Sequence, residues 1–103
     1  MPKISGTQIV TVSTAVAGST IMRFTDQVVG MVHVPAGSGM TSLYWFTAPT
    51  ENGEYCFAYE VGTNGVQAVA AGRAYQFPPE LVGAAFVKAS SPTAGTFTLV
   101  FKG

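Results

Sequence analysis

Short runs rich in Val, Thr, Phe and Tyr recur about every ten residues along the chain, and clusters of Gly, Pro, Asn and Ser separate them. Evenly spaced short runs with turn residues between them are typical of an all-β sandwich or barrel. The pattern therefore predicts a single antiparallel β-sandwich or jelly-roll of about eight strands. The predicted strands cover 7–13, 19–25, 27–34, 40–48, 54–60, 66–71, 84–90 and 96–102.

The turn residues indicate how some of these strands connect. Asn52-Gly53 and Asn64-Gly65 are strong hairpin signals, because Asn and Gly adopt positive φ at low cost. We therefore expect the strand at 40–48 to pair with 54–60, and 54–60 to pair in turn with 66–71.

Other segments are expected to lie outside the strands. The glycine-rich stretch from Val34 to Met40 is predicted to be a turn, and residues 78–82, which begin Pro78-Pro79, are predicted to form at most one helical turn. Residues 1–6 precede the strand pattern and are expected to form an N-terminal arm. A chain of 103 residues is expected to fold as one domain spanning 1–103.

The two faces of each predicted strand differ in what they present. The last strand alternates as a half-buried strand should, with Phe97, Leu99 and Phe101 on one side. Three other segments, 27–34, 40–48 and 54–60, are apolar on both faces, so either a long loop or another subunit must cover the second face. The residues that we expect at a subunit interface are Val29, Met31, His33, Trp45 and Arg73.

The charge content favours the subunit interface. Charged residues make up 10% of the chain, five basic and five acidic, whereas about a quarter is usual for a soluble domain. The net charge of zero provides no field that would attract nucleic acid or an anionic membrane. We expect neither as a partner, and no apolar run is long enough to cross a bilayer. The start of the chain lacks the pattern of a secretory signal, so we expect synthesis in a cytoplasm.

Candidate chemistry is sparse. Cys56, His33 and Asp26 are the single Cys, His and Asp of the chain, and no surrounding motif resembles a nucleophile turn. One His and one Cys are too few for a structural zinc site. We therefore expect no enzymatic activity, no metal and no cofactor, and we expect Cys56 to be a small buried apolar residue.

Two further readings involve aromatic and charged residues. Trp45 with Tyr44 is a candidate aromatic platform for a sugar, with hydrogen bonds from Asn52, Glu54 or Arg73, although packing in the core or an interface is the alternative for Trp45. Arg73 is expected either to pair with an acidic residue inside the fold or to contact a partner. The acidic candidates are Glu60 and Glu80.

The order of several segments resembles that of the small β-sandwich virion proteins of tailed bacteriophages. A strand precedes each of two turns, and a Gly-Arg-Ala-Tyr motif leads through a Pro-rich turn into an apolar strand that ends in Lys. The segments are Phe-Thr-Asp-Gln at 24–27, Val-Pro-Ala-Gly at 34–37, Pro-Thr-Glu-Asn-Gly-Glu-Tyr at 49–55, residues 71–88 and the closing strand.

This resemblance implies a non-enzymatic structural role on a virion. Capsid decoration or cement proteins are of this kind, and the implied partners are the major capsid protein and further copies of the chain itself, with a trimer favoured. The alternative is a carbohydrate-binding or structural module of a phage tail, baseplate or fibre. The family supplies no catalytic residues to transfer onto this sequence.

Overall fold

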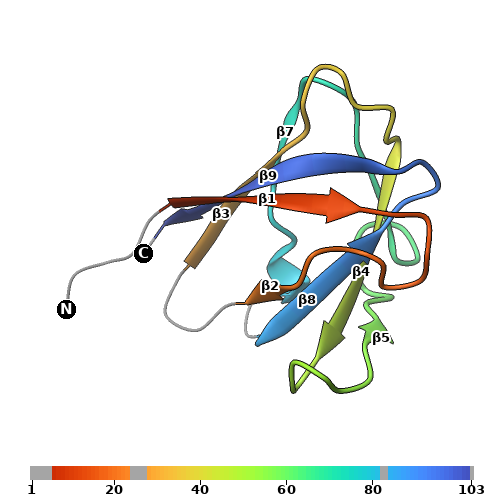
Figure 1. Cartoon of the computed structure of the whole chain (residues 1–103), viewed down its shortest axis with the longest axis vertical. Helices are drawn as coiled ribbons and strands as arrows, with labels where there is room; N and C mark the ends of the chain where they lie inside the picture. Colours follow the sequence, from red (N-terminus) through yellow and green to blue (C-terminus); the bar gives the residue numbers. More distant parts are fainter. Residues whose placement is uncertain (1–5, 24–27, 82–83, 103) are drawn as a thin grey trace.

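The computed structural model describes residues 6–23, 28–81 and 84–102, which form an all-β fold of two antiparallel sheets (Figure 1). Nine strands and one 3₁₀ turn lie in these residues. They are β1 (Gly6–Val12), β2 (Met22–Arg23), β3 (Val28–His33), β4 (Ser42–Ala48), β5 (Cys56–Phe57), β6 (Val66–Ala68), β7 (Ala74–Gln76), η1 (Pro79–Leu81), β8 (Phe86–Ser90) and β9 (Gly95–Lys102). The predicted all-β sandwich class is thus confirmed.

The first sheet has the strand order β1-β9-β3-β7. The first and last strands of the chain pair along their length, from Gly6 opposite Phe101 to Val12 opposite Gly95. The ladder between β9 and β3 shifts register between Val29 and Met31, so β3 is bulged there. This sheet joins the two ends of the described chain.

The second sheet has the order β2-β8-β4-β5, and β6 also pairs with β4. The predicted hairpin between 40–48 and 54–60 is confirmed, because Phe46 and Thr47 of β4 lie opposite Phe57 and Cys56. The second predicted hairpin is wrong. β6 pairs with the first half of β4 rather than with β5, and the chain between them turns tightly at residues 62–65.

β5 and β6 are short because they share one edge of β4. The Ala58 N–H still donates to the Trp45 carbonyl at 2.8 Å. The Val61 N–H then donates to the Ala58 carbonyl at 3.3 Å, which forms a turn in which the chain leaves the sheet. Asn64 and Gly65 both have positive φ, as their sequence predicts, and form a local turn. Asn64-Gly65 thus predicted the turn correctly, but the strand pairing expected from it is wrong.

β7 was not predicted, because it is only three residues long and lies between Gly72 and Pro78. Its pairing with Met31, Val32 and His33 of β3 creates it. The predicted turn at 34–40 is confirmed by a hydrogen bond of 3.1 Å from the Ser38 N–H to the Pro35 carbonyl. η1 fulfils the expected helical turn. The arm expected at 1–6, apart from Gly6, and the segments 24–27 and 82–83 lie outside the described residues.

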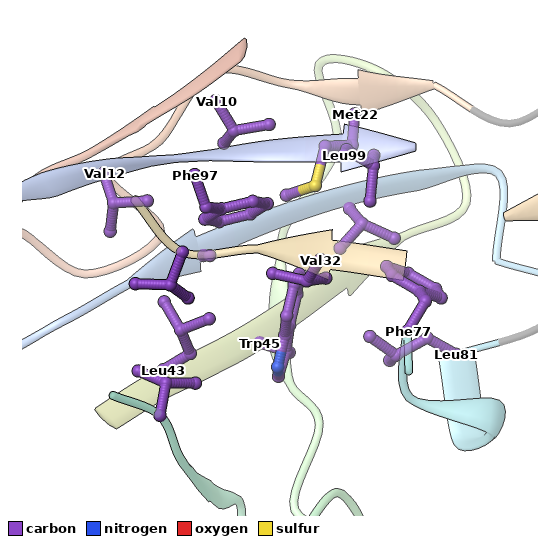
Figure 2. Packing of buried hydrophobic residues seen from close by; sticks show 14 of the residues in the cluster. Val10, Val12, Met22, Val32, Leu43, Trp45, Phe77, Leu81, Phe97 and Leu99 are labelled. Atoms are coloured by element: carbon purple, nitrogen blue, oxygen red, sulfur yellow. The ribbon is translucent and has the colours of Figure 1, made fainter. Parts of the chain in front are cut away.

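The hydrophobic core lies between the two sheets and is centred on Trp45 (Figure 2). The Trp45 side chain is 0% exposed. Its ring meets Phe97 of the opposite sheet edge-on at 5.8 Å and Phe77 at 5.4 Å between ring centroids. Its indole N–H donates to the Gln67 Oε1 atom at 2.8 Å, so the one polar atom of the ring is satisfied.

Alternation along β9 places Phe97 and Leu99 in this core and leaves Phe101 half-buried, as the sequence predicts. Leu99, Val32 and Gln8 lie side by side across three strands. Leu99 and Val32 are fully buried. The opposite side chains of the same strands therefore point away from the core.

Replacing Trp45 by alanine is expected to lower the free energy of unfolding by about 3–5 kcal/mol, because it removes a large buried ring and leaves a cavity. Urea unfolding monitored by circular dichroism measures this change. Ile9→Ala is the matched control, because Ile9 is 69% exposed, and it is expected to change stability by less than about 0.5 kcal/mol. Equal effects of the two substitutions would contradict the central role of Trp45.

Candidate functional site

On the outer side of the four-stranded sheet, the side chains that the structure describes include no acidic, Lys or Arg residue. Lys102, the last residue of β9, continues the same alternation, and its side chain is outside the described part. One row runs across the strands from Ile9 through Thr98 and His33 to Ala74, as the strand register shows. We call this surface the threonine face. Its members are Thr7, Ile9, Thr11, Met31, His33, Ala74, Gln76, Thr96, Thr98 and Val100.

The threonine face has an unusual composition for a solvent-facing sheet. None of its described members is an acidic, Lys or Arg residue. Ile9 is 69% exposed at one side of the row, and Met31 and Val100 are half-buried opposite each other. Burying such a surface removes apolar area from water without stripping water from a charge.

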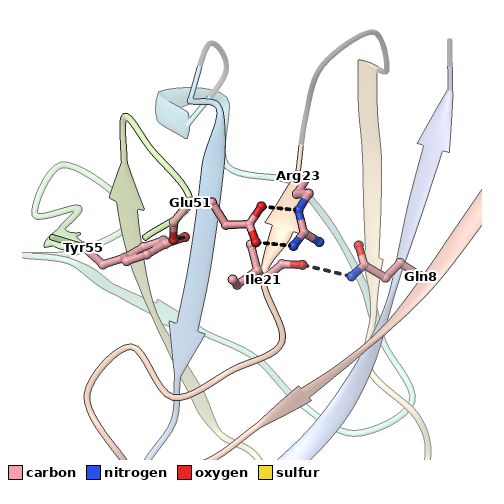
Figure 3. Close-up of polar contacts among 5 residues, drawn as sticks. All are labelled: Gln8, Ile21, Arg23, Glu51 and Tyr55. Atoms are coloured by element: carbon pink, nitrogen blue, oxygen red, sulfur yellow. Dashed lines mark hydrogen bonds and ion pairs between the residues drawn. The ribbon is translucent and has the colours of Figure 1, made fainter. Parts of the chain in front are cut away.

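The outer edge of this sheet along β1 is occupied by the chain's own residues. The Thr20 N–H donates to the Thr11 carbonyl at 3.1 Å. The Gln8 Nε2 group donates to the Ile21 carbonyl, also at 3.1 Å (Figure 3). These bonds pair part of the β1 edge with groups of the chain itself.

The outer side of the five-stranded sheet carries a cluster of aromatic rings around Phe57. The Phe57 ring lies 5.5 Å from Phe46, 6.5 Å from Tyr44 and 6.4 Å from Tyr59, measured between centroids. We call Tyr44, Phe46, Phe57 and Tyr59 the aromatic face. Phe57 is 44% exposed and Tyr59 is 59% exposed, so this cluster covers Phe46 but is itself open to solvent.

Gly65 lies directly against the Phe57 ring. A Cβ atom at Gly65 would lie 2.2 Å from the Phe57 Cζ atom, and Gly65 has a φ of +83°. A glycine is therefore required twice here, for the backbone conformation and for the close approach of the ring.

Charged groups lie on the same sheet as the aromatic face, where Lys88 of β8 is opposite Phe46. Figure 3 shows the pairing of Arg23 with Glu51. The Arg23 guanidinium donates from Nε to the Glu51 Oε1 atom at 2.9 Å and from Nη2 to Oε2 at 2.7 Å. The Tyr55 hydroxyl donates to the Glu51 carbonyl at 2.9 Å. The Lys88 Nζ atom lies 4.6 Å from the centroid of the Tyr55 ring, a cation–π contact.

These contacts change the acidity of the groups involved. The hydrogen bond from Arg23 lowers the pKa of Glu51 below its ordinary value of 4.5, and the same bond raises the pKa of Arg23. Desolvation by burial raises the pKa of the Tyr55 phenol, and the Glu51 charge adds to this effect. All three groups therefore keep their usual charge states near neutral pH.

The expected interface residues do not gather on one surface. Met31 and His33 both lie on the threonine face, and Val29 is in the same strand, although its side chain is outside the described part. Trp45 is removed from the set, because it fills the core of its own chain. It also points to the opposite side of β4 from Tyr44, so the two rings form no shared sugar platform.

Arg73 is exposed at the start of β7, and no ion pair joins it to Glu60 or Glu80 within the described residues. Cys56 is exposed, contrary to expectation, because β5 is an edge strand too short to be covered. Cys56 and His33 lie in different sheets, and Asp26 is outside the described residues. In the part of the chain that the structure describes, no group of His, Cys, Asp or Glu is arranged to hold a metal ion.

Sequence reasoning did not select Phe57, Tyr59 or Ile9 as surface residues. Alternation alone leaves open which face of an apolar strand is covered, and β5 was predicted to be a longer, paired strand. Comparison with protein-family models, curated proteins and solved structures finds no match to this chain. Within the described ranges, no helix has the length and apolar character needed to span a membrane.

Replacing Gly65 by alanine is expected to cost about 1–3 kcal/mol of stability, since the new Cβ would be strained at positive φ and would displace the Phe57 ring. Thermal or urea unfolding measures the loss. Gly37→Ala is the control, because a Cβ there meets nothing within 4 Å. Equal stability of the two variants would show that Gly65 is not needed under Phe57.

Replacing Arg23 by glutamine is expected to raise the pKa of Glu51 toward 4.5, as followed by NMR titration of its side-chain carboxyl. The lowered pKa means that the ion pair stabilises the fold above about pH 4.5 and that this contribution disappears as the pH falls through the folded-state pKa. Lys88→Gln removes a nearby cation that does not contact Glu51 and is expected to leave its titration unchanged. An unaltered Glu51 titration in Arg23→Gln would contradict the pairing.

Proposed function

We propose that this chain is a non-enzymatic structural protein that binds the outside of a tailed-phage capsid as a decoration or cement protein. The observation that carries the proposal is the threonine face, a broad sheet surface without described acidic, Lys or Arg side chains. The order of segments that resembles small β-sandwich virion proteins supports the same role. The proposed partners are the major capsid protein and further copies of this chain, for which we favour a trimer.

The physical basis of the role is contact area rather than chemistry. A stable protein interface buries about 1,600 Å² in total, and a flat sheet surface is suited to contact of that kind. Thr hydroxyls on the face can donate and accept hydrogen bonds with backbone groups of a shell, while Ile9, Met31 and Val100 supply apolar area. A copy that binds across a joint between two capsid subunits adds to the free energy needed to separate them. In an oligomer, the other bound copies keep each copy at a high effective concentration near its site, so it dissociates from the shell less readily.

Quantitative mass spectrometry of purified particles tests the proposal. A decoration protein is expected at a copy number comparable with that of the major capsid protein, because its sites repeat over the shell. A few copies per particle would instead favour a tail, baseplate or fibre module. Complete absence from particles would overturn the proposal.

Introducing a charge on the threonine face by Met31→Glu is expected to weaken binding to purified shells about a hundredfold or more, because an unpaired carboxylate would be buried in the contact. Co-sedimentation of the purified protein with shells measures this change. Val16→Glu is the matched control, since Val16 is exposed in the turn after β1 and away from the face. Circular dichroism checks that both variants are folded, and wild-type binding by a folded Met31→Glu protein would contradict the assignment of the face.

A further inference from the structure

An open pocket of about 390 Å³ lies beside the aromatic face, between the end of β5 and η1. We call it the acidic pocket. Its lining includes Phe57, Tyr59, Glu60, Val61, Glu80 and Leu81. Val61 and Leu81 are buried and form an apolar floor, whereas the two aromatic rings and the two glutamates are exposed around it.

The chemistry of the acidic pocket favours a cationic side chain. Among its described lining residues there is no Lys, Arg or His, and neither Glu60 nor Glu80 takes part in an ion pair in the described structure. Carboxylates accept charge-assisted hydrogen bonds from a guanidinium, and aromatic faces attract the same group through cation–π contact. Arg presents both a planar fork of donors and a stackable face, so it matches this lining better than Lys.

Among the Lys and Arg residues whose side chains the structure describes, Arg73 is the one for which no carboxylate or ring partner is found. Arg23 is bound to Glu51, and Lys88 lies over Tyr55. Arg73 is exposed and has only small residues, Ala71, Gly72 and Ala74, beside it in the chain. Its backbone carbonyl accepts a 2.9 Å hydrogen bond from the Val34 N–H, which anchors the base of the side chain to β3.

Arg73 does not line the pocket of its own chain, and no ion pair joins it to Glu60 or Glu80 in the described structure. It precedes β7, whereas Glu80 follows β7 in η1, so the two residues lie at opposite ends of that strand. The unpaired guanidinium and the unpaired carboxylates therefore belong to separate parts of one surface. Complementary patches at separate positions produce a head-to-tail contact between copies, and such contacts close into rings when the rotation permits.

We infer that the acidic pocket binds Arg73 of a second copy of this chain. The guanidinium lies between Glu60 and Glu80 and against the Phe57 or Tyr59 ring, and each copy donates one Arg and offers one pocket. The inference deepens the proposed function, since it identifies the contact through which the decoration protein self-associates.

Charge reversal at the two partners tests the inference. One variant carries Arg73→Glu, and the other carries Glu60→Lys with Glu80→Lys. Sedimentation-velocity centrifugation of the full chain over a concentration series measures self-association. Each variant alone is expected to associate at least about tenfold more weakly than the wild type, because like charges then meet at the contact.

A third variant that combines Arg73→Glu with Glu60→Lys and Glu80→Lys in one chain is expected to recover association. In every copy the reversed side chain at position 73 then meets the basic pocket of the next copy, so each contact of a head-to-tail ring is complementary whatever the number of copies. Glu54→Lys is the matched control, because Glu54 is exposed but does not line the pocket. It is expected to associate as the wild type does.

Each possible result either supports or overturns the inference. Recovery in the combined variant supports the inference, while a monomeric wild type, unchanged association of both single-partner variants, or failure of the folded combined variant to recover would each overturn it. If a reversed variant unfolds by circular dichroism, Arg73→Gln and the Glu60→Gln, Glu80→Gln pair replace it and are each expected to weaken association. If the wild type binds shells but the substitutions at Arg73, Glu60 and Glu80 leave self-association unchanged, the inference alone is overturned. If self-association depends on these residues but the protein does not bind shells, the decoration role alone is overturned.

Discussion

The burial of Trp45 between the two sheets is the interaction on which the rest of the structure depends. Its ring lies between Phe97 and Phe77, and its N–H is satisfied only because Gln67 of β6 lies beside it. An unpaired indole N–H in this core would be costly, so the hydrogen bond favours β6 against the first half of β4. β5 pairs with the second half of the same edge and is only two residues long. No further strand pairs with β5 among the described residues, and Phe57 is exposed. A core requirement thus creates the aromatic face.

The distribution of polar groups gives the two sheets different capacities for contact. No buried side-chain nitrogen or oxygen in the described part lacks a hydrogen-bond partner, so the core holds no unsatisfied group that a ligand would complete. Arg23 and Lys88 lie on the same sheet as the aromatic face, where covering them would require each charge to keep a partner. The threonine face imposes no such requirement among its described residues. A large contact area is therefore less costly to bury on the four-stranded sheet.

The sequence predicted best where one alternation pattern and one local turn were enough. The inward side of β9 follows from Phe97 and Leu99 in this way. The 40–48 hairpin was also predicted correctly, although Asn52 and Gly53 do not adopt the positive φ on which that prediction was based, and the turn instead closes with a hydrogen bond from the Gly53 N–H to the Thr50 carbonyl. The pairing of β6 did not follow, because it depends on Gln67 reaching Trp45 across the sheet, and β7 exists only through its pairing with β3. Likewise, alternation marked β4 as apolar on both faces without showing which side is the core. The assignment of Trp45 to an interface and of Cys56 to the interior both failed for that reason.

Low charge is a property of the whole chain, yet its effect depends on where the few charges lie. Arg73 and the acidic pocket are on different parts of the surface, and neither belongs to the described threonine face. In the proposed arrangement, one copy contacts a neighbour through the pocket while its sheet face lies against a shell. Each contact is individually modest, but a copy held by its neighbours stays at high effective concentration near its own shell site. Under this proposal the scarcity of charge has two consequences, since the described side chains of the threonine face bring no like charges together and Arg73 with the acidic pocket directs how copies meet.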